Sequence, residues 1–129
     1  MTRTYDFPDP PVVDWAATEA LVVANGITLE RRRGSAHPRF PEIVYPLDYG
    51  SVDDTIGEDG EPIDVFVGSG PARLVGAYRT VDRRRGDTEL KLLWGLTADE
   101  VYLVHGFLTF APALMTATLA LRDDLAALR

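Results

Sequence analysis

The sequence predicts a protein of the α+β class, built as a partly closed antiparallel β-barrel of five or six short strands with helices packed outside it. Its 129 residues are 46% hydrophobic and 26% charged, which is the size and composition of one globular domain. Short β-rich runs follow one another through the middle of the chain, and helical patterns lie at both ends. Successive strands followed by helices are typical of this class.

We expect a single domain over residues 1–129, in which residues 1–11, rich in Pro and Asp, form an extended arm. A short helix should follow, with Asp14 as its N-cap and Gly26 just past its end. Residues 27–31 then alternate apolar and polar side chains, which predicts a strand.

The middle of the chain combines a basic loop with further strands. Residues 31–40 contain Gly34, Pro38 and several Arg and His side chains, so we interpret them as a loop. The remaining strands are expected at residues 43–45, 63–67, 74–81 and 90–94. Residues 82–87 should join the last two strands as a hairpin.

The C-terminal third is predicted to be helical. Residues 97–100 fit a capping box, and Pro112 is a good first residue for a helix over residues 112–128. Residues 101–121 contain no Asp, Glu, Lys or Arg, so a membrane span is one alternative. Because Pro112 interrupts the stretch, we favour two packed helices or a subunit interface, with His105 buried.

Charge and cysteine content narrow the function. The formal net charge is −7 and the pI about 4.7, so nucleic acid is not an expected partner. The chain has no cysteine, which excludes disulfides and thiolate zinc sites and fits a reducing cytoplasm. We expect no secretory signal at the N-terminus, which has no apolar run.

The strongest chemical signal is an acidic segment that contains Asp59, Glu61 and Asp64. Gly60 permits a tight turn between the first two acids, and Asp64 lies inside an apolar strand. Hard carboxylate oxygens brought together in this way suit Mg²⁺. The alternative is an ordinary Asp-Gly turn with solvated acids.

Basic residues supply a second signal. Lys91 is the only lysine, and it lies two positions after Glu89, so both side chains should point to the same face of a strand. They form either a surface ion pair or a phosphate contact with a metal ligand beside it. The loop over residues 31–40 could likewise clamp phosphate or be a solvated charge run, and residues 83–85 fit the solvated run better.

Together these residues resemble a known family. The pattern Tyr45-Pro46-Leu47-Asp48-Tyr49-Gly50, followed by Asp59-Gly60-Glu61-Pro62-Ile63-Asp64-Val65, is similar to that of the soluble (family I) inorganic pyrophosphatases. Residues 34–39 resemble the short bacterial branch of that family. The resemblance covers residues 27–93.

The resemblance implies an OB-like five-stranded barrel in which Mg²⁺ ions hold pyrophosphate while a metal-bound water attacks phosphorus. It implies that Glu61 takes the proton of that water, and that Tyr49 and Lys91 contact phosphate. Arg33 or Arg39 would substitute for cationic residues of a family hairpin that this chain lacks. The implied metal ligands are Glu30, Asp59, Asp64, Asp82 and Glu89.

Several positions depart from the family pattern. Glu61 and Glu89 stand where the family has aspartates, Ser51 replaces a tyrosine, and the C-terminal Tyr-Lys pair is missing. The leading hypothesis is a cytoplasmic, homo-oligomeric, Mg²⁺-dependent hydrolase of pyrophosphate or a related small phosphoanhydride. The alternatives are a catalytically weakened member that binds phosphate, nucleotide or metal in a regulatory role, and an oligomeric interaction protein.

Overall fold

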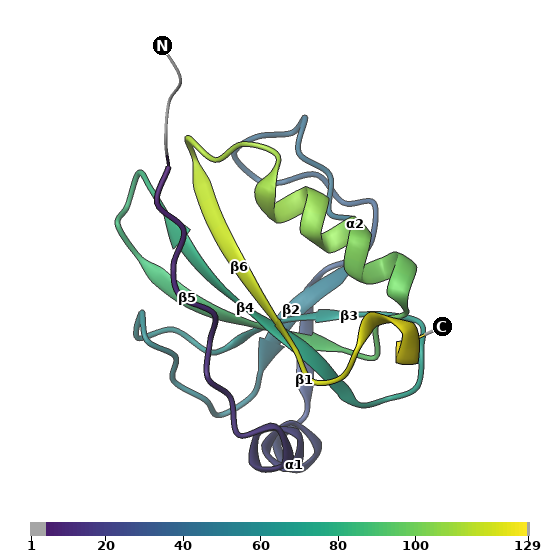
Figure 1. The fold of residues 1–129 in the computed structure, drawn as a ribbon. Coiled ribbons are helices and arrows are strands. Elements are labelled where there is room, and N and C mark those ends of the chain that lie inside the picture. The colour runs from purple at the N-terminus through teal and green to yellow at the C-terminus, as the bar shows by residue number, and fades with distance from the viewer. Residues whose placement is uncertain (1–4, 129) are drawn as a thin grey trace.

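A computed structural model describes residues 5–128, and the strands within them form one six-stranded sheet (Figure 1). The part of the expected arm before Tyr5 lies outside the described residues. The helices are α1 (Trp15–Asn25), α2 (Ala98–Thr109) and the 3₁₀ helix η1 (Leu125–Leu128). The strands are β1 (Ile27–Arg31), β2 (Asp48–Val52), β3 (Asp64–Val67), β4 (Leu74–Asp82), β5 (Thr88–Trp94) and β6 (Met115–Leu121).

The sheet has the strand order β1-β2-β3-β5-β4-β6. All neighbouring strands are antiparallel except β3 and β5, which run parallel. The α+β class is confirmed, but the sheet has six strands rather than the five that the family resemblance implied, and the parallel β3–β5 pair departs from the expected antiparallel pairing. Both central strands carry consecutive buried apolar residues, Val65-Phe66 and Leu92-Leu93, as is usual for strands that are covered on both faces.

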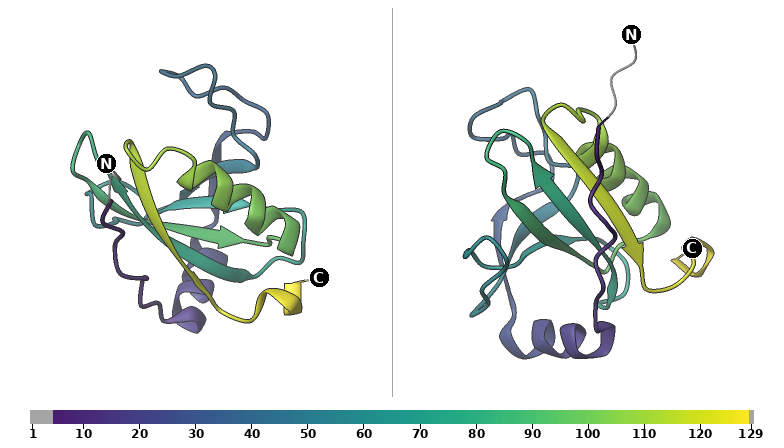
Figure 2. Two further views of the ribbon diagram at one scale, coloured as in Figure 1. Left: turned by 45° about the horizontal axis from the view of Figure 1, so that its top comes forward. Right: turned by 60° about the vertical axis from the view of Figure 1, so that its left-hand side comes forward.

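The two helices pack on opposite faces of the curved sheet (Figure 2). Beneath α2, Val104 and Leu108 join a core that contains Tyr49, Phe66 and Leu93. Beneath α1, Val22 joins a second core with Val52, Val65 and Leu92. Because neighbouring residues of a strand point to opposite faces, Val65 and Phe66 contribute to different cores.

The local signals for the two helices are confirmed. The Asp14 side chain accepts a hydrogen bond from the backbone N–H of Ala17 at 3.1 Å, and Gly26 follows the helix with φ +85°. Thr97 and Glu100 form the expected capping box of α2. Side-chain caps of this kind satisfy backbone groups that a helix terminus leaves unpaired.

Two strands were not anticipated. Residues 43–45 contribute only an isolated bridge between Ala36 and Val44, whereas β2 begins at Asp48. The helix predicted over residues 112–128 is wrong, because residues 115–121 form β6, which pairs with β4 along its whole length. The β4 edge supplies backbone partners that outweigh the high helix propensity of Met, Ala and Leu in this segment.

His105 lies on α2 but is exposed, contrary to expectation. Its Nδ1 is 2.7 Å from the hydroxyl oxygen of buried Tyr78. No helix within residues 5–128 is long and apolar enough to span a bilayer.

Candidate functional site

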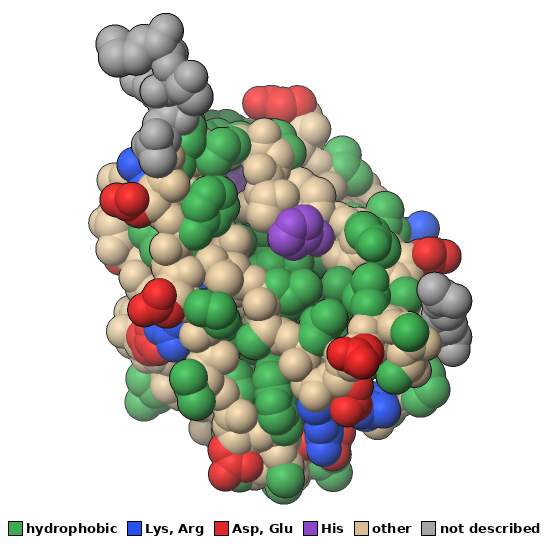
Figure 3. Space-filling view, in the orientation of Figure 1, with side chains coloured by type: hydrophobic (Ala, Val, Ile, Leu, Met, Phe, Trp, Pro, Cys, Tyr) green, Lys and Arg blue, Asp and Glu red, His purple; other side chains and the backbone are tan. Residues whose placement is uncertain are grey.

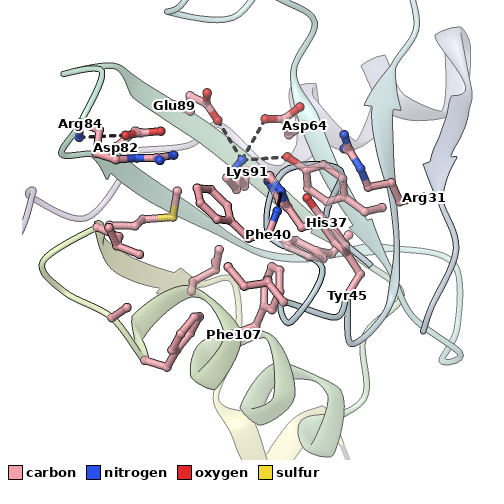
Figure 4. Close-up of a pocket in the computed structure, with 18 residues that line it drawn as sticks. Arg31, His37, Phe40, Tyr45, Asp64, Asp82, Arg84, Glu89, Lys91 and Phe107 are labelled. Atoms are coloured by element: carbon pink, nitrogen blue, oxygen red, sulfur yellow. Dashed lines mark hydrogen bonds and ion pairs between the residues drawn. The ribbon is translucent and has the colours of Figure 1, made fainter. Parts of the chain in front are cut away.

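The site is centred on the ammonium group of Lys91, which lies on β5 and is 6% exposed. It donates hydrogen bonds to the Tyr49 hydroxyl at 2.8 Å, to Asp64 Oδ2 at 3.0 Å and to Glu89 Oε2 at 2.8 Å (Figure 4). A lysine ammonium has three N–H groups, so each of them has a partner.

The sheet register produces this arrangement. Asp64 is paired directly with Lys91 across the parallel β3–β5 ladder. Glu89 precedes Lys91 by two residues on the same strand, which places both side chains on one face, as predicted. Tyr49 comes from the neighbouring strand β2. Three strands therefore fix four polar groups around one point.

Burial and charge control the protonation of these groups. Burial by itself would lower the pKa of Lys91, but the oxygens of Tyr49, Asp64 and Glu89 outweigh it and raise that pKa overall. Burial raises the pKa of Tyr49. Lys91 is therefore a cation at neutral pH, and Tyr49 keeps its hydroxyl proton.

A cavity of about 260 Å³ opens beside this cluster. Asp82 and Arg84 enter it from the end of the β4–β5 hairpin, and Arg31 from the end of β1. The polar lining side chains are Arg31, His37, Asp64, Asp82, Arg84, Glu89 and Lys91. The remaining lining side chains are apolar or aromatic and come from α2, the segment after it and the loop around Phe40, together with Tyr49 on β2, Phe66 on β3 and Met115 on β6.

Two arginines give the cavity positive charge. The Arg31 guanidinium lies 5.3 Å from the centre of the Tyr45 ring, and that of Arg84 lies 4.8 Å from the centre of the Phe40 ring. Within residues 5–128, neither guanidinium forms an ion pair. Burial lowers the pKa of His37, and the charges of Arg31, Arg84 and Arg39 lower it further.

The expected arginines are not the ones that line the cavity. Arg33 and Arg39 are exposed, and their backbone N–H groups donate to Asp48 Oδ1 and His37 Nδ1. Arg31 and Arg84 each belong to a run of three arginines. The sequence therefore indicated two basic runs but not which arginine of each run lines the cavity. Arg31 is the last residue of β1, which gives its side chain a fixed direction.

The acidic residues that were predicted to bind metal or to accept the proton lie in two separate places. Asp64, Asp82 and Glu89 line the cavity, whereas Asp59, Glu61 and Glu30 do not. Asp59 Oδ1 instead accepts the backbone N–H of Glu61 at 3.0 Å, across Gly60 with φ +82°. Glu30 Oε1 accepts from the Ser51 hydroxyl at 3.0 Å.

Within residues 5–128, no group of three or more His, Asp or Glu side chains lies close enough together to hold a metal ion. The metal roles of Glu30, Asp59, Asp64, Asp82 and Glu89 therefore stay predictions, as do the substrate and catalytic roles of Glu61, Arg33 and Arg39.

Comparison with known proteins defines the class. A sequence model of the family "Inorganic pyrophosphatase" matches residues 29–100, which is more than half of the chain. The chain therefore belongs to the inorganic pyrophosphatase family. The match includes Lys91 and all of the acids that were predicted to act in the site, which are Glu30, Asp59, Glu61, Asp64, Asp82 and Glu89.

Individual relatives match over a shorter region. The inorganic pyrophosphatase of Corynebacterium glutamicum is 40% identical over 60 residues, which is 40% of this chain and 38% of that protein. That of Streptomyces coelicolor is 38% identical over 60 residues, covering 40% and 37%. The matched region thus spans well under half of these relatives.

Solved structures support the fold. The inorganic pyrophosphatase of Neisseria gonorrhoeae superposes with a TM-score of 0.58 at 18% identity, covering 76% of this chain and 84% of that one. The Helicobacter pylori enzyme gives a TM-score of 0.52 at 19% identity, covering 79% and 85%. The expected OB-like architecture is confirmed at this level.

Proposed function

We propose that this protein hydrolyses inorganic pyrophosphate to two phosphates with the help of a divalent metal, Mg²⁺. The observation that supports this most is the Lys91 cluster: a buried cation and two carboxylates beside a cavity that also holds two guanidiniums without an ion pair within residues 5–128. These are the groups that phosphoryl transfer requires, because its catalysis depends on positioning and charge stabilisation. Membership of the inorganic pyrophosphatase family adds to this support.

The carboxylates are compatible with Mg²⁺. Asp64 and Glu89 converge on Lys91 through one oxygen each. Within residues 5–128, no further hydrogen bond or ion pair uses the second oxygen of Glu89. Mg²⁺ commonly binds through one or two carboxylates together with waters and substrate phosphates. Asp64 and Glu89 would hold the ion, with Asp82 at the edge of the cavity.

The chain's own residues bind and orient the substrate. Arg31 and Arg84 are placed to grip phosphate oxygens through their guanidinium forks, and Lys91 supplies a fixed positive charge between the two carboxylates. When bound, Mg²⁺ supplies further positive charge and lowers the pKa of water. Glu61 as the proton acceptor is part of the proposal, and it requires the loop over residues 53–62 to approach the cavity.

The experiment is phosphate release from pyrophosphate with and without Mg²⁺. We expect Mg²⁺-dependent turnover, reduced about 100-fold in Asp64→Asn, the usual scale for removing one charge-stabilising group. Asp9→Asn is the matched control, because Asp9 is exposed and does not line the cavity. If the unmodified chain releases no more phosphate than Asp64→Asn, the hydrolase proposal is wrong.

A second candidate is a weakened member that binds phosphate, nucleotide or metal without fast turnover. It is favoured by the Lys91 ammonium, whose three N–H groups are all used within the protein, and by the position of Glu61 outside the cavity. Calorimetry with Mg²⁺ and phosphate distinguishes the two: binding without phosphate release supports the weakened member.

Assembly and location are further proposals. Hydrophobic side chains gather on the face that α2 and β6 share (Figure 3), and Tyr102 and Leu103 on α2 are 68% and 47% exposed. Exposed apolar surface of this kind supports a homo-oligomer. The same surface is what the remaining alternative, an oligomeric interaction protein without enzymatic activity, would require. The absence of cysteine supports a cytoplasmic location.

A further inference from the structure

The cavity has two chemically different halves. The charged half contains Lys91, Asp64 and Glu89, with Asp82 and Arg84 towards the hairpin. Facing it is an apolar half, which we define by Phe40, Phe107, Phe110, Leu114 and Met115. Figure 4 shows Lys91 and Glu89 on the sheet, with Phe107 across from them on α2.

Inorganic pyrophosphate uses only the charged half. All of its outer atoms are charged or polar oxygens, so contact with hydrocarbon side chains would remove water from these oxygens without replacing its hydrogen bonds. The apolar half nevertheless remains open to solvent, since Phe110 is 62% exposed and Leu114 is 41% exposed. A ligand with a hydrocarbon group would cover surface that pyrophosphate leaves wet.

Arg84 and Phe40 mark the boundary between the halves. The Arg84 guanidinium lies 4.8 Å from the centre of the Phe40 ring, so one phosphate-binding group adjoins the apolar half directly. Phe40 in turn lies 5.3 Å from the His37 ring. A phosphate held by Arg84 would therefore have an aromatic surface next to it.

The polarity of the apolar half favours hydrocarbon over a nucleobase. The ring of His37 lies beside Phe40, and its Nδ1 already accepts the backbone N–H groups of Arg39 at 3.0 Å and Phe40 at 3.3 Å. A nucleobase needs several hydrogen-bond partners to be recognised. Phe40, Phe107 and Phe110 instead offer ring surfaces, and aromatic groups pack well against them.

We propose that the site accepts an organic diphosphate, a diphosphate monoester that carries a small aromatic or alkenyl group, with this group in the apolar half. The inference rests on the proposed function of the charged half as a diphosphate site. The cavity volume of about 260 Å³ is just below the range of about 300–1,000 Å³ for small-molecule sites, so the organic group is small.

Hydrolysis of such a ligand balances with water alone. The water oxygen forms a bond to the terminal phosphorus, and the bond from that phosphorus to the bridging oxygen breaks. The bridging oxygen keeps the electron pair and leaves on the organic phosphate monoester. The products are this monoester, inorganic phosphate and one proton, which passes to solvent.

The test compares phenyl diphosphate with methyl diphosphate by calorimetry in the presence of Mg²⁺. The two ligands differ only in the hydrocarbon group, so their charged contacts cancel. We expect phenyl diphosphate to bind about tenfold more tightly, as burial of much of a phenyl group predicts. Equal affinities would overturn the inference.

Matched variants locate the effect. The phenyl-to-methyl affinity ratio should fall severalfold towards one in Phe110→Ala and in Leu114→Ala. It should be unchanged in Tyr102→Ala, which removes an exposed aromatic group of α2 that lies outside the cavity. A ratio that is high in the unmodified chain but equal in all three variants would overturn the assignment to the apolar half.

Other outcomes separate this inference from the proposed hydrolysis. Phosphate release from pyrophosphate together with equal binding of the two esters would overturn the inference alone. Preferred binding of phenyl diphosphate without phosphate release would uphold the inference and contradict the hydrolysis. A ratio of one, with dissociation of an oligomer in Phe110→Ala by light scattering, would show that a second copy of the chain covers the apolar half and would overturn the inference.

Discussion

Two acids of the same segment, Asp64 and Asp59, are held in position in different ways. Asp64 lies on β3, where the parallel ladder fixes it opposite Lys91, and its side chain forms a long-range ion pair at 3.0 Å. Asp59 lies in the loop between β2 and β3, and its side chain bonds the backbone two residues further on. The strand acid is therefore held by tertiary structure, whereas the loop acid is held by its own turn.

Under the proposed function, this difference would give the two regions separate roles. The strand region is pre-arranged around a buried cation, which costs no further ordering when a phosphate arrives. The loop region can contribute ligands only by moving towards the cavity. Substitutions in the strand region should therefore have larger effects than substitutions in the loop.

The largest effect is expected for Lys91→Met, which removes the buried cation. Its side chain is 7% exposed, and those of Asp64 and Glu89 are 23% and 21% exposed, so two carboxylates would face each other without a counter-charge. Loss of one partner of a buried pair costs about 3–5 kcal/mol; we expect about 3 kcal/mol from urea unfolding. Arg32→Met, at an exposed arginine, should change stability by less than ~0.5 kcal/mol. Equal stabilities of the two variants would contradict the account.

Tyr49→Phe should have an intermediate effect. It deletes one of the three hydrogen bonds to the Lys91 ammonium, and hydrogen bonds to charged groups contribute about 1.5–3 kcal/mol. We expect unfolding to become easier by about 2 kcal/mol. Tyr102→Phe is the control, because Tyr102 is 68% exposed. A loss no larger than that of the control would show that the Tyr49–Lys91 bond contributes little.

Alkaline pH should weaken the strand region in a defined direction. The pKa of Lys91 is raised in the folded protein, so its contribution to stability is complete below the unfolded lysine pKa of about 10.4. Above that pH the unfolded state loses the proton first, and stability falls as pH rises. The raised pKa of Tyr49 acts in the same direction from about pH 10.

The measurement is the free energy of unfolding between pH 8 and pH 11 for the unmodified chain and for Lys91→Met. We expect a shallower alkaline decline in the variant, because it has lost the Lys91 contribution. Parallel declines would mean that Lys91 is not stabilised in its charged form.

The smallest effect is expected in the loop. Asp59→Asn should change stability by less than ~0.5 kcal/mol, since an asparagine side-chain oxygen can accept the same backbone N–H within the turn. Thermal unfolding with Asp64→Asn alongside measures the contrast. A larger loss for Asp59→Asn than for Asp64→Asn would reverse the assignment of the two regions.

The sequence predicted features with short-range causes. The N-cap Asp14, the capping box from Thr97 to Glu100 and the shared face of Glu89 and Lys91 each depend on residues a few positions apart. Resemblance to the family added Tyr49 to the group around Lys91, and the structure brings these residues together.

Features with long-range causes were missed. Strand β6 depends on the free edge of β4, and the parallel β3–β5 pair joins strands separated by the whole of β4. Neither partnership has a local signature in residues 115–121 or 64–67. For the same reason, the sequence could not identify Arg31 and Arg84 as the arginines that reach the cavity.

The most direct test of the account is the activity of Glu89→Gln, which keeps the size of the side chain but removes its charge beside Lys91. The account predicts Mg²⁺-dependent phosphate release from pyrophosphate by the unmodified chain, with kcat/KM reduced about 100-fold in Glu89→Gln. Glu42→Gln, at an exposed position outside the cavity, should match the unmodified chain. Equal values of kcat/KM for Glu89→Gln and Glu42→Gln would contradict the claim that the Lys91 cluster is the centre of the site.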